Sequence, residues 1–73
     1  MEKYVLANVT SATMHIMMNV FNSYDDAFQQ MEKEYNSVHD VQSENIACCD
    51  IYKYSAYIVA DYDYSWEIQR VSD

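Results

Sequence analysis

The amino-acid sequence predicts an α+β fold in which one amphipathic helix packs on one face of a four-stranded antiparallel sheet, in the order β-β-α-β-β. Three observations predict it. Apolar residues recur at the helical period between residues 21 and 38, and runs with strand-like alternation lie on both sides of that segment. No linker, repeat or low-complexity tract interrupts the 73 residues. We therefore expect a single domain, residues 1–73.

Residues 3–10 and 14–21 are expected to form the first two strands, joined by a turn at residues 10–13. Alternation places Val5, Ala7 and Val9 on one face of the first run. It places Met14, Ile16, Met18 and Val20 on one face of the second run. Methionine also favours helices, so the second run has a helical alternative. We prefer the strand because Ser23 is a good residue with which to begin a helix.

The clearest element is the helix over residues 21–38. Its apolar stripe has a period of about 3.6 residues and consists of Tyr24, Ala27, Phe28, Met31, Tyr35 and Val38. Ser23 precedes the stripe and Asp26 follows three residues later, as in a capping box. The negative charge of Asp26 also suits the positive end of the helix dipole. We expect the helix to fray near His39 and Asp40.

Residues 52–60 and 64–71 are expected to form a hairpin with its turn at residues 61–63. On the first of these strands, Tyr54, Ala56 and Ile58 share one face. On the second strand, Trp66 and Ile68 share another. Between the helix and this hairpin, residues 41–51 are ambiguous. They fit either a connector or an additional strand.

One helix covers only one face of such a sheet, so the other face is expected to be open. The alternation assigns seven residues to it: Tyr4, Leu6, His15, Met17, Phe21, Tyr57 and Val59. An exposed surface this apolar usually marks an interaction site. Residues 41–51, a second copy or another partner would cover it. For a homodimer, we expect Met17, Phe21 and Tyr57 at the seam.

Composition limits the classes of partner. Twelve acidic and four basic residues give a net charge of −8. Direct binding to nucleic acid or to anionic membranes is disfavoured, because both need a basic patch. A basic protein partner is favoured by long-range attraction. The sequence shows neither a signal peptide nor an apolar membrane span, and it has no disulfide framework, so we expect a cytoplasmic protein.

No motif for metal binding or catalysis emerges from the sequence. The candidate metal ligands are His15, His39, Cys48 and Cys49, and the adjacent cysteines lack the spacing of a zinc site. On a strand, the two cysteines point to opposite sides, with one packed as a small hydrophobe. Residues 61–67 open like a calcium loop, but Trp66 and Ser72 occupy positions that need Gly and Glu. No nucleophile signature is present. We expect no metal, no cofactor and no enzymatic activity.

Acidic and aromatic residues cluster in the last third of the chain. Two residues apart on a strand, Asp61 and Asp63 would form an anionic row. With interleaved aromatics, such a row can imitate a phosphate backbone and attract the Lys and Arg of a nucleic-acid channel. The predicted partner-binding residues are Asp61, Tyr62, Asp63, Tyr64 and Glu67, with Glu32 and Glu34 secondary. Alternatively, the tyrosines only suit strands and the acids only provide solubility.

The helix SYDDAFQQMEKEYNSV and the following SAYIVADYDYSWEIQRV resemble, in size, charge and layout, small acidic accessory proteins of phages and mobile elements. These proteins are of the anti-CRISPR or anti-restriction kind, and some are DNA mimics. The resemblance implies a non-catalytic inhibitor that occupies a basic nucleic-acid-binding groove of a host defence protein, such as a CRISPR effector. It assigns a role to no single residue. The alternative is a self-associating structural or assembly protein that dimerises through the open sheet face.

Overall fold

The structure, a computed structural model, describes residues 2–72, which form one helix and five strands. The elements are β1 (Glu2–Thr10), β2 (Ile16–Phe21), α1 (Tyr24–Val41), β3 (Cys48–Ile51), β4 (Ser55–Val59) and β5 (Asp63–Ser72). The predicted α+β class with one helix and an antiparallel sheet is confirmed. The predicted number of four strands is wrong, because the ambiguous segment 41–51 contains the short strand β3.

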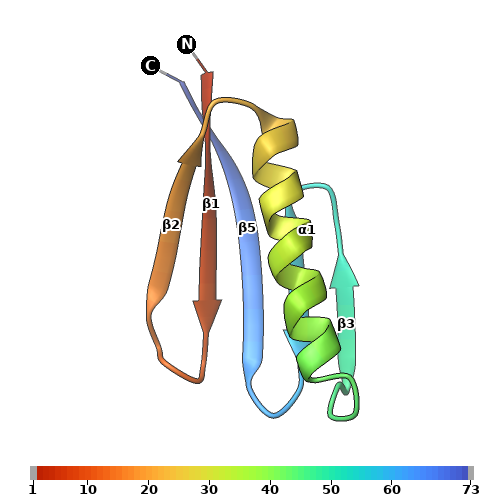
Figure 1. Cartoon of the computed structure of the whole chain (residues 1–73). Helices are drawn as coiled ribbons and strands as arrows, with labels where there is room; N and C mark the ends of the chain where they lie inside the picture. The colour runs from red at the N-terminus through yellow and green to blue at the C-terminus, as the bar shows by residue number, and fades with distance from the viewer. Residues whose placement is uncertain (1, 73) are drawn as a thin grey trace.

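All five strands belong to one antiparallel sheet with the order β2-β1-β5-β4-β3. The two longest strands, β1 and β5, pair at its centre and bring the two ends of the chain together (Figure 1). Helix α1 carries the chain from the β2 edge to the β3 edge and lies on one face of the sheet. It covers β5, β4 and part of β1, and it leaves β2 uncovered except at Phe21 (Figure 1).

The start of α1 is set by its cap. Ser23 has an extended backbone, and its Oγ accepts a hydrogen bond from the Asp26 amide at 3.2 Å, which satisfies one of the free N–H groups of the first turn. The predicted N-cap at Ser23 is confirmed. The helix ends at Val41 rather than near residue 38, because no glycine or proline stops it, and Gln42 N–H bonds to the Val38 carbonyl.

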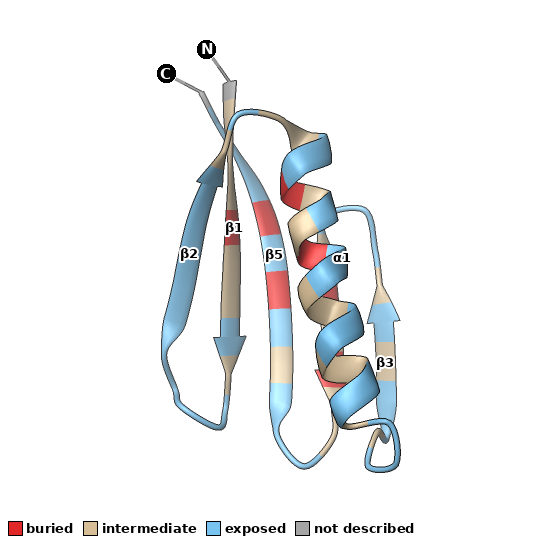
Figure 2. Cartoon of the chain, in the orientation of Figure 1, coloured by how far each residue is buried: buried red, intermediate tan, exposed pale blue. Residues whose placement is uncertain are grey.

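The core lies between α1 and the sheet. It consists of Leu6, Ala27, Met31, Ala56, Ile58, Trp66 and Ile68, all buried (Figure 2). The remaining members of the helical stripe pack against these residues: Tyr24, Phe28, Tyr35 and Val38. The stripe predicted from periodicity is therefore the buried face of α1. Of the residues predicted to share faces on the second hairpin, Ala56, Ile58, Trp66 and Ile68 are buried, whereas Tyr54 lies before β4 and is exposed.

The strand residues of the first hairpin share faces as predicted, but the face expected to be open is the one that lies toward α1. Leu6 is fully buried under the helix, and Tyr4 and Phe21 pack against the core. The register pairs Leu6 with Ile68 and Tyr4 with Phe21, so the residues between them, such as Val5 and Ala7, face away from α1. Both faces of β1 are apolar, and alternation alone does not rank them. The longer side chains fill the space beneath the helix, where an alanine would leave a void.

A methionine pair tests this assignment of inside and outside. Met31→Ala removes a fully buried side chain and is expected to lower the free energy of unfolding by about 2–5 kcal/mol. The same change at Met17, which is 62% exposed, is expected to alter it by less than about 0.5 kcal/mol. Urea titration followed by far-UV circular dichroism measures both. Equal losses in the two variants would contradict the described core.

Candidate functional site

The face of the sheet opposite α1 carries exposed apolar side chains on its β1–β2 side. Ile16 is 67% exposed, Met18 is 65% exposed and Val20 is 62% exposed, and the register places all three on the side of Val5 and Ala7. Two further exposed residues adjoin them, Val9 at the end of β1 and Met14 in the turn. We call Val9, Met14, Ile16, Met18 and Val20 the apolar zone.

Met14 adds a conformational observation to this zone. Its φ is 58°, which places a long unbranched side chain in the left-handed region that glycine or asparagine usually occupies. The turn is closed by a hydrogen bond from the Met14 amide to the Thr10 carbonyl at 2.9 Å. The chain therefore presents a large apolar side chain to solvent at a position where a smaller residue would be less strained.

The other side of the same face carries carboxylates. Asp63 and Glu67 lie on β5, and Asp50 lies on β3 opposite Tyr57 of β4. All three are exposed. Among residues 3–71, the strand register places only one lysine or arginine on this face, Lys3 at the far end of β1. We call Asp50, Asp63 and Glu67 the acidic zone.

Asp50 also organises the aromatic residues next to it. The Tyr52 hydroxyl hydrogen-bonds to the Asp50 carboxylate, and this contact raises the pKa of Tyr52. The Tyr52 ring in turn stacks on Tyr57, with centroids 6.3 Å apart. The acidic zone is thus bordered by an ordered aromatic pair, and sequence reasoning missed Asp50 because residues 41–51 were not assigned to a strand.

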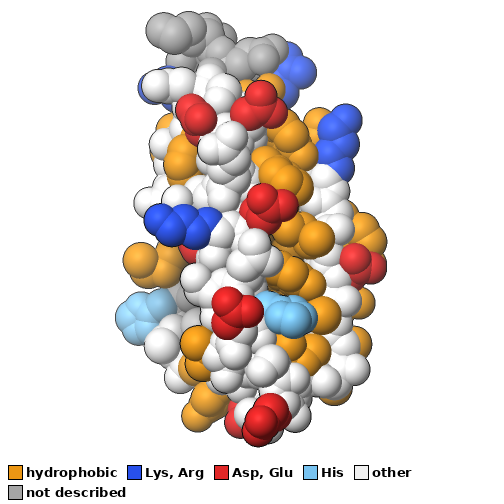
Figure 3. Space-filling model, turned by 45° about the vertical axis from the view of Figure 1, so that its right-hand side comes forward, with side chains coloured by type: hydrophobic (Ala, Val, Ile, Leu, Met, Phe, Trp, Pro, Cys, Tyr) orange, Lys and Arg blue, Asp and Glu red, His pale blue; other side chains and the backbone are white. Residues whose placement is uncertain are grey.

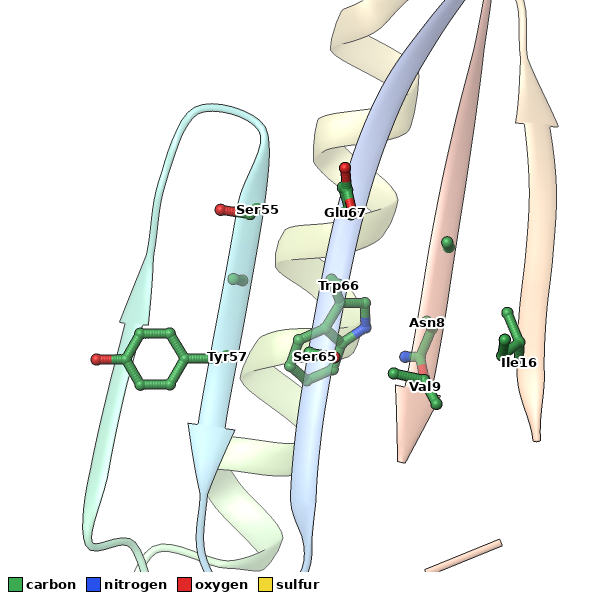
Figure 4. A pocket seen from close by; sticks show the side chains of 10 residues that line it. Asn8, Val9, Ile16, Ser55, Tyr57, Ser65, Trp66 and Glu67 are labelled. Carbon is green, nitrogen blue, oxygen red and sulfur yellow. The ribbon is translucent and has the colours of Figure 1, made fainter. Parts of the chain in front are cut away.

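A groove runs along β5, between the apolar zone and β4, and the β5 residues of the acidic zone line it. Its lining on the apolar side includes Val9, Met14 and Ile16, and on the other side Tyr57 and Val59. Ser65 lies between them, and its small side chain makes the floor, with Glu67 farther along the strand (Figure 4). The groove is therefore apolar on its walls and carboxylate-bearing along β5. An extended segment with alternating apolar and basic side chains fits this pattern.

The structure brings only some of the predicted partner-binding residues together. Asp63 and Glu67 share the open face, whereas Tyr64 faces α1 and stacks on Trp66 with centroids 6.3 Å apart. Asp61 and Tyr62 lie in the turn before β5. The predicted strand row of Asp61 and Asp63 is not formed, since β5 begins only at Asp63.

The predicted dimer seam is also divided between the two faces. Phe21 packs against the core, and Met17 shares its side of β2. Tyr57 lies on the opposite side, in the wall of the groove. These three side chains therefore do not form one surface.

Glu34 is held by internal hydrogen bonds. Its Oε1 accepts from Trp66 Nε1–H and from Asn8 Nδ2–H, both at 3.1 Å, and its Oε2 accepts from Gln30 Nε2–H at 2.7 Å. The carboxylate joins α1 to the two central strands and satisfies the indole of the buried Trp66. Glu32, by contrast, is exposed on the helix. The structural role of Glu34 was not evident from the sequence.

The acidic side chains on the helix-bearing side are dispersed. Figure 3 shows them at separate points along that side, with a band of apolar side chains beside the helix. Within residues 2–72, no group of three or more His, Cys, Asp or Glu residues is arranged to hold a metal ion. Cys49 packs against the core and Cys48 is exposed, as predicted for neighbours on a strand. The strongest candidate for a functional surface is therefore the open face.

Comparison with known proteins gives no family assignment: no protein-family model matches the chain, and no curated protein or solved structure is detectably similar to it. Over the described part of the chain, α1 is too polar to cross a membrane, and no other helix is present.

Replacing Glu34 tests its role in joining helix and sheet. Glu34→Ala leaves the Trp66 indole N–H and the Asn8 amide without their acceptor, so the free energy of unfolding is expected to fall by about 1–3 kcal/mol. Glu32→Ala, the matched change on the exposed side, is expected to cost less than about 0.5 kcal/mol. Thermal and urea unfolding measure both variants. A Glu34→Ala protein as stable as Glu32→Ala would refute the role.

The raised pKa of Tyr35 predicts that the stability of the fold depends on pH in the alkaline range. Burial, together with a hydrogen bond to Cys49, raises the pKa of Tyr35 to about 12, whereas an unfolded tyrosine has a pKa of about 10. The unfolded chain therefore loses this proton first, so stability is retained below pH 10 and falls as pH rises toward 12. Tyr35→Phe is expected to reduce this fall in urea titrations at several pH values. An identical pH slope in variant and wild type would contradict it.

Proposed function

We propose that this chain is a non-catalytic binding protein that docks its open sheet face onto a basic protein and acts by occupying that protein's surface. One observation carries the proposal: a single uncovered face combines exposed apolar residues, a groove and three carboxylates. Burial of the apolar side chains removes their surface from water and so favours binding, and the carboxylates select a partner rich in Lys and Arg. Interfaces of this kind commonly have an apolar centre and a charged rim.

The partner class follows from charge. With a net charge of −8, the chain is drawn to strongly basic surfaces, and nucleic-acid-binding grooves are surfaces of this kind. A CRISPR effector or another nucleic-acid-handling protein fits this description. The contact set that we propose is the acidic zone with Tyr57, joined by Asp61 and Tyr62 from the adjacent turn. Glu34 is left out because its carboxylate is already bonded within the fold.

The mode of inhibition we propose is steric and electrostatic competition, without a regular copy of phosphate spacing. Asp63 and Glu67 are four residues apart on one strand, which corresponds to roughly 13 Å. Consecutive phosphates of one DNA strand would need a closer series. The open face therefore competes for the same lysines and arginines as nucleic acid, with apolar contacts that nucleic acid does not make.

Laying the open faces of two copies on each other is a weaker alternative. It would bring Asp50, Asp63 and Glu67 of both copies into one buried layer. Like charges buried together are costly unless they are paired with cations, and among residues 3–71 the register places no lysine or arginine other than Lys3 on this face. A basic partner removes that cost.

Charge reversal on the open face tests the proposal. Tagged chain is used to capture proteins from a nuclease-treated bacterial lysate, and each captured protein is then purified and its affinity measured. We expect the wild-type chain to capture a basic protein. The association rate constant of this protein should be about tenfold lower, or more, with the double variant Asp63→Lys/Glu67→Lys than with the wild type. The affinity should also weaken as salt is raised, because the charges are exposed.

The matched control is Glu32→Lys/Glu44→Lys, which replaces two exposed acids away from the open face. Both double variants have a net charge of −4, since each replacement adds two positive charges to −8. The control is expected to retain most of the wild-type affinity. Equal losses in both variants would show that only total charge matters, and retention by Asp63→Lys/Glu67→Lys would exclude the open face as the contact.

A further inference from the structure

The two edges of the sheet differ in how well they are protected against pairing with another strand. β3 forms one edge with four residues, of which Asp50 is charged. β2 forms the other edge with the six residues IMMNVF, none of them charged and none proline. Its pairing with β1 runs without interruption from Val9–Ile16 to Tyr4–Phe21, so no bulge twists the edge away. Such an edge is a ready template for another strand.

The outer side of β2 is also uncovered by the rest of the molecule. Figure 1 shows β2 at the side of the sheet away from α1, and Figure 2 shows it exposed along its length up to Phe21. In an antiparallel edge strand, alternate residues direct N–H and C=O groups outward. A paired strand would supply hydrogen-bond partners for those groups.

The distribution of charge identifies the occupant. Residues 3–22, the first hairpin with its flanks, contain one base, Lys3, and no acid. Residues 23–71 contain ten acids and three bases, and the other two acids are Glu2 and Asp73. A basic partner is drawn to the second region, whereas the neutral, apolar hairpin attracts no charged molecule. Two copies with a charge of −8 can meet there with little repulsion.

We propose that β2 of one copy pairs antiparallel with β2 of a second copy, so that two chains form a homodimer with one continuous ten-stranded sheet. A twofold axis perpendicular to the sheet at Met18 relates the two copies. This axis keeps both helices on the same side and joins the two open faces on the other. It sets Met18 against Met18 of the second copy and Ile16 against Val20, so apolar side chains meet across the seam.

The geometry keeps the carboxylates apart. From β5 of one copy to β5 of the other there are five strand spacings, about 24 Å in all. Charges are screened over about 8 Å at physiological ionic strength, so Asp63 and Glu67 of the two copies do not repel appreciably. The inference goes beyond the proposed function, because it uses the β2 edge and leaves both acidic zones free. A dimer would present two of them to one partner or to two.

The test is the oligomeric state of the full chain by sedimentation velocity, from about 1 μM to about 0.5 mM. The wild type is expected to reach about 17 kDa, twice the chain mass of 8.6 kDa. Met18→Lys places a charge against its own copy across the axis and is expected to give a monomer. Gln29→Lys, the same charge on the exposed side of α1, is the matched control and should remain dimeric.

Two further measurements keep the result decisive. Tyr57→Ser alters the groove wall on β4, three strands from β2 in the sheet order, so it should leave an edge-paired dimer intact but break one that stacks open faces. Amide hydrogen exchange should show protection of β2 that rises with concentration, independently of whether Met18→Lys folds well. A wild type that stays monomeric, a Met18→Lys dimer, or exchange at β2 unaffected by concentration would overturn the proposal. None of these outcomes bears on capture of a basic partner.

Discussion

The structure depends on the difference in width between one helix and a five-stranded sheet. A helix with its side chains is about 10–12 Å across, whereas the axes of five adjacent strands span about 19 Å. One helix therefore buries the inner residues of β5 and β4 and Leu6 of β1, and β2 stays outside its cover except at Phe21. The far face of the sheet has no covering element among residues 2–72. Both candidate interaction surfaces result from this single constraint.

The helix is held in place by more than apolar contact. Trp66 brings a large buried ring and one N–H group, and a buried donor without an acceptor would cost about 1–3 kcal/mol. Glu34 supplies the acceptor and also bonds to Asn8 of β1. Because these bonds cross from α1 to both central strands, they fix how the helix lies on the sheet. The open face inherits its geometry from that orientation.

The first hairpin is nearly neutral and the rest of the chain is acidic, and the fold places these two regions in different parts of the molecule. The neutral first hairpin becomes the uncovered edge, and the acidic remainder becomes the helix, the turn before β5 and the acidic zone. The two regions favour different kinds of contact, because apolar edges pair without regard to charge and carboxylates select cations. Self-association and binding of a basic partner are therefore compatible on one small protein.

The sequence by itself determined the local elements with strong signals. The period of α1, its Ser23 cap and the inward residues of β4 and β5 were all predictable, since they depend on spacing within one segment. Tertiary structure alone decided the rest. β1 is apolar on both faces, so only the packing of Leu6 under α1 set its orientation. β3 is too short to show a period. The acidic zone brings Asp50 near the carboxylates of β5 through the order of the strands, which no local pattern contains.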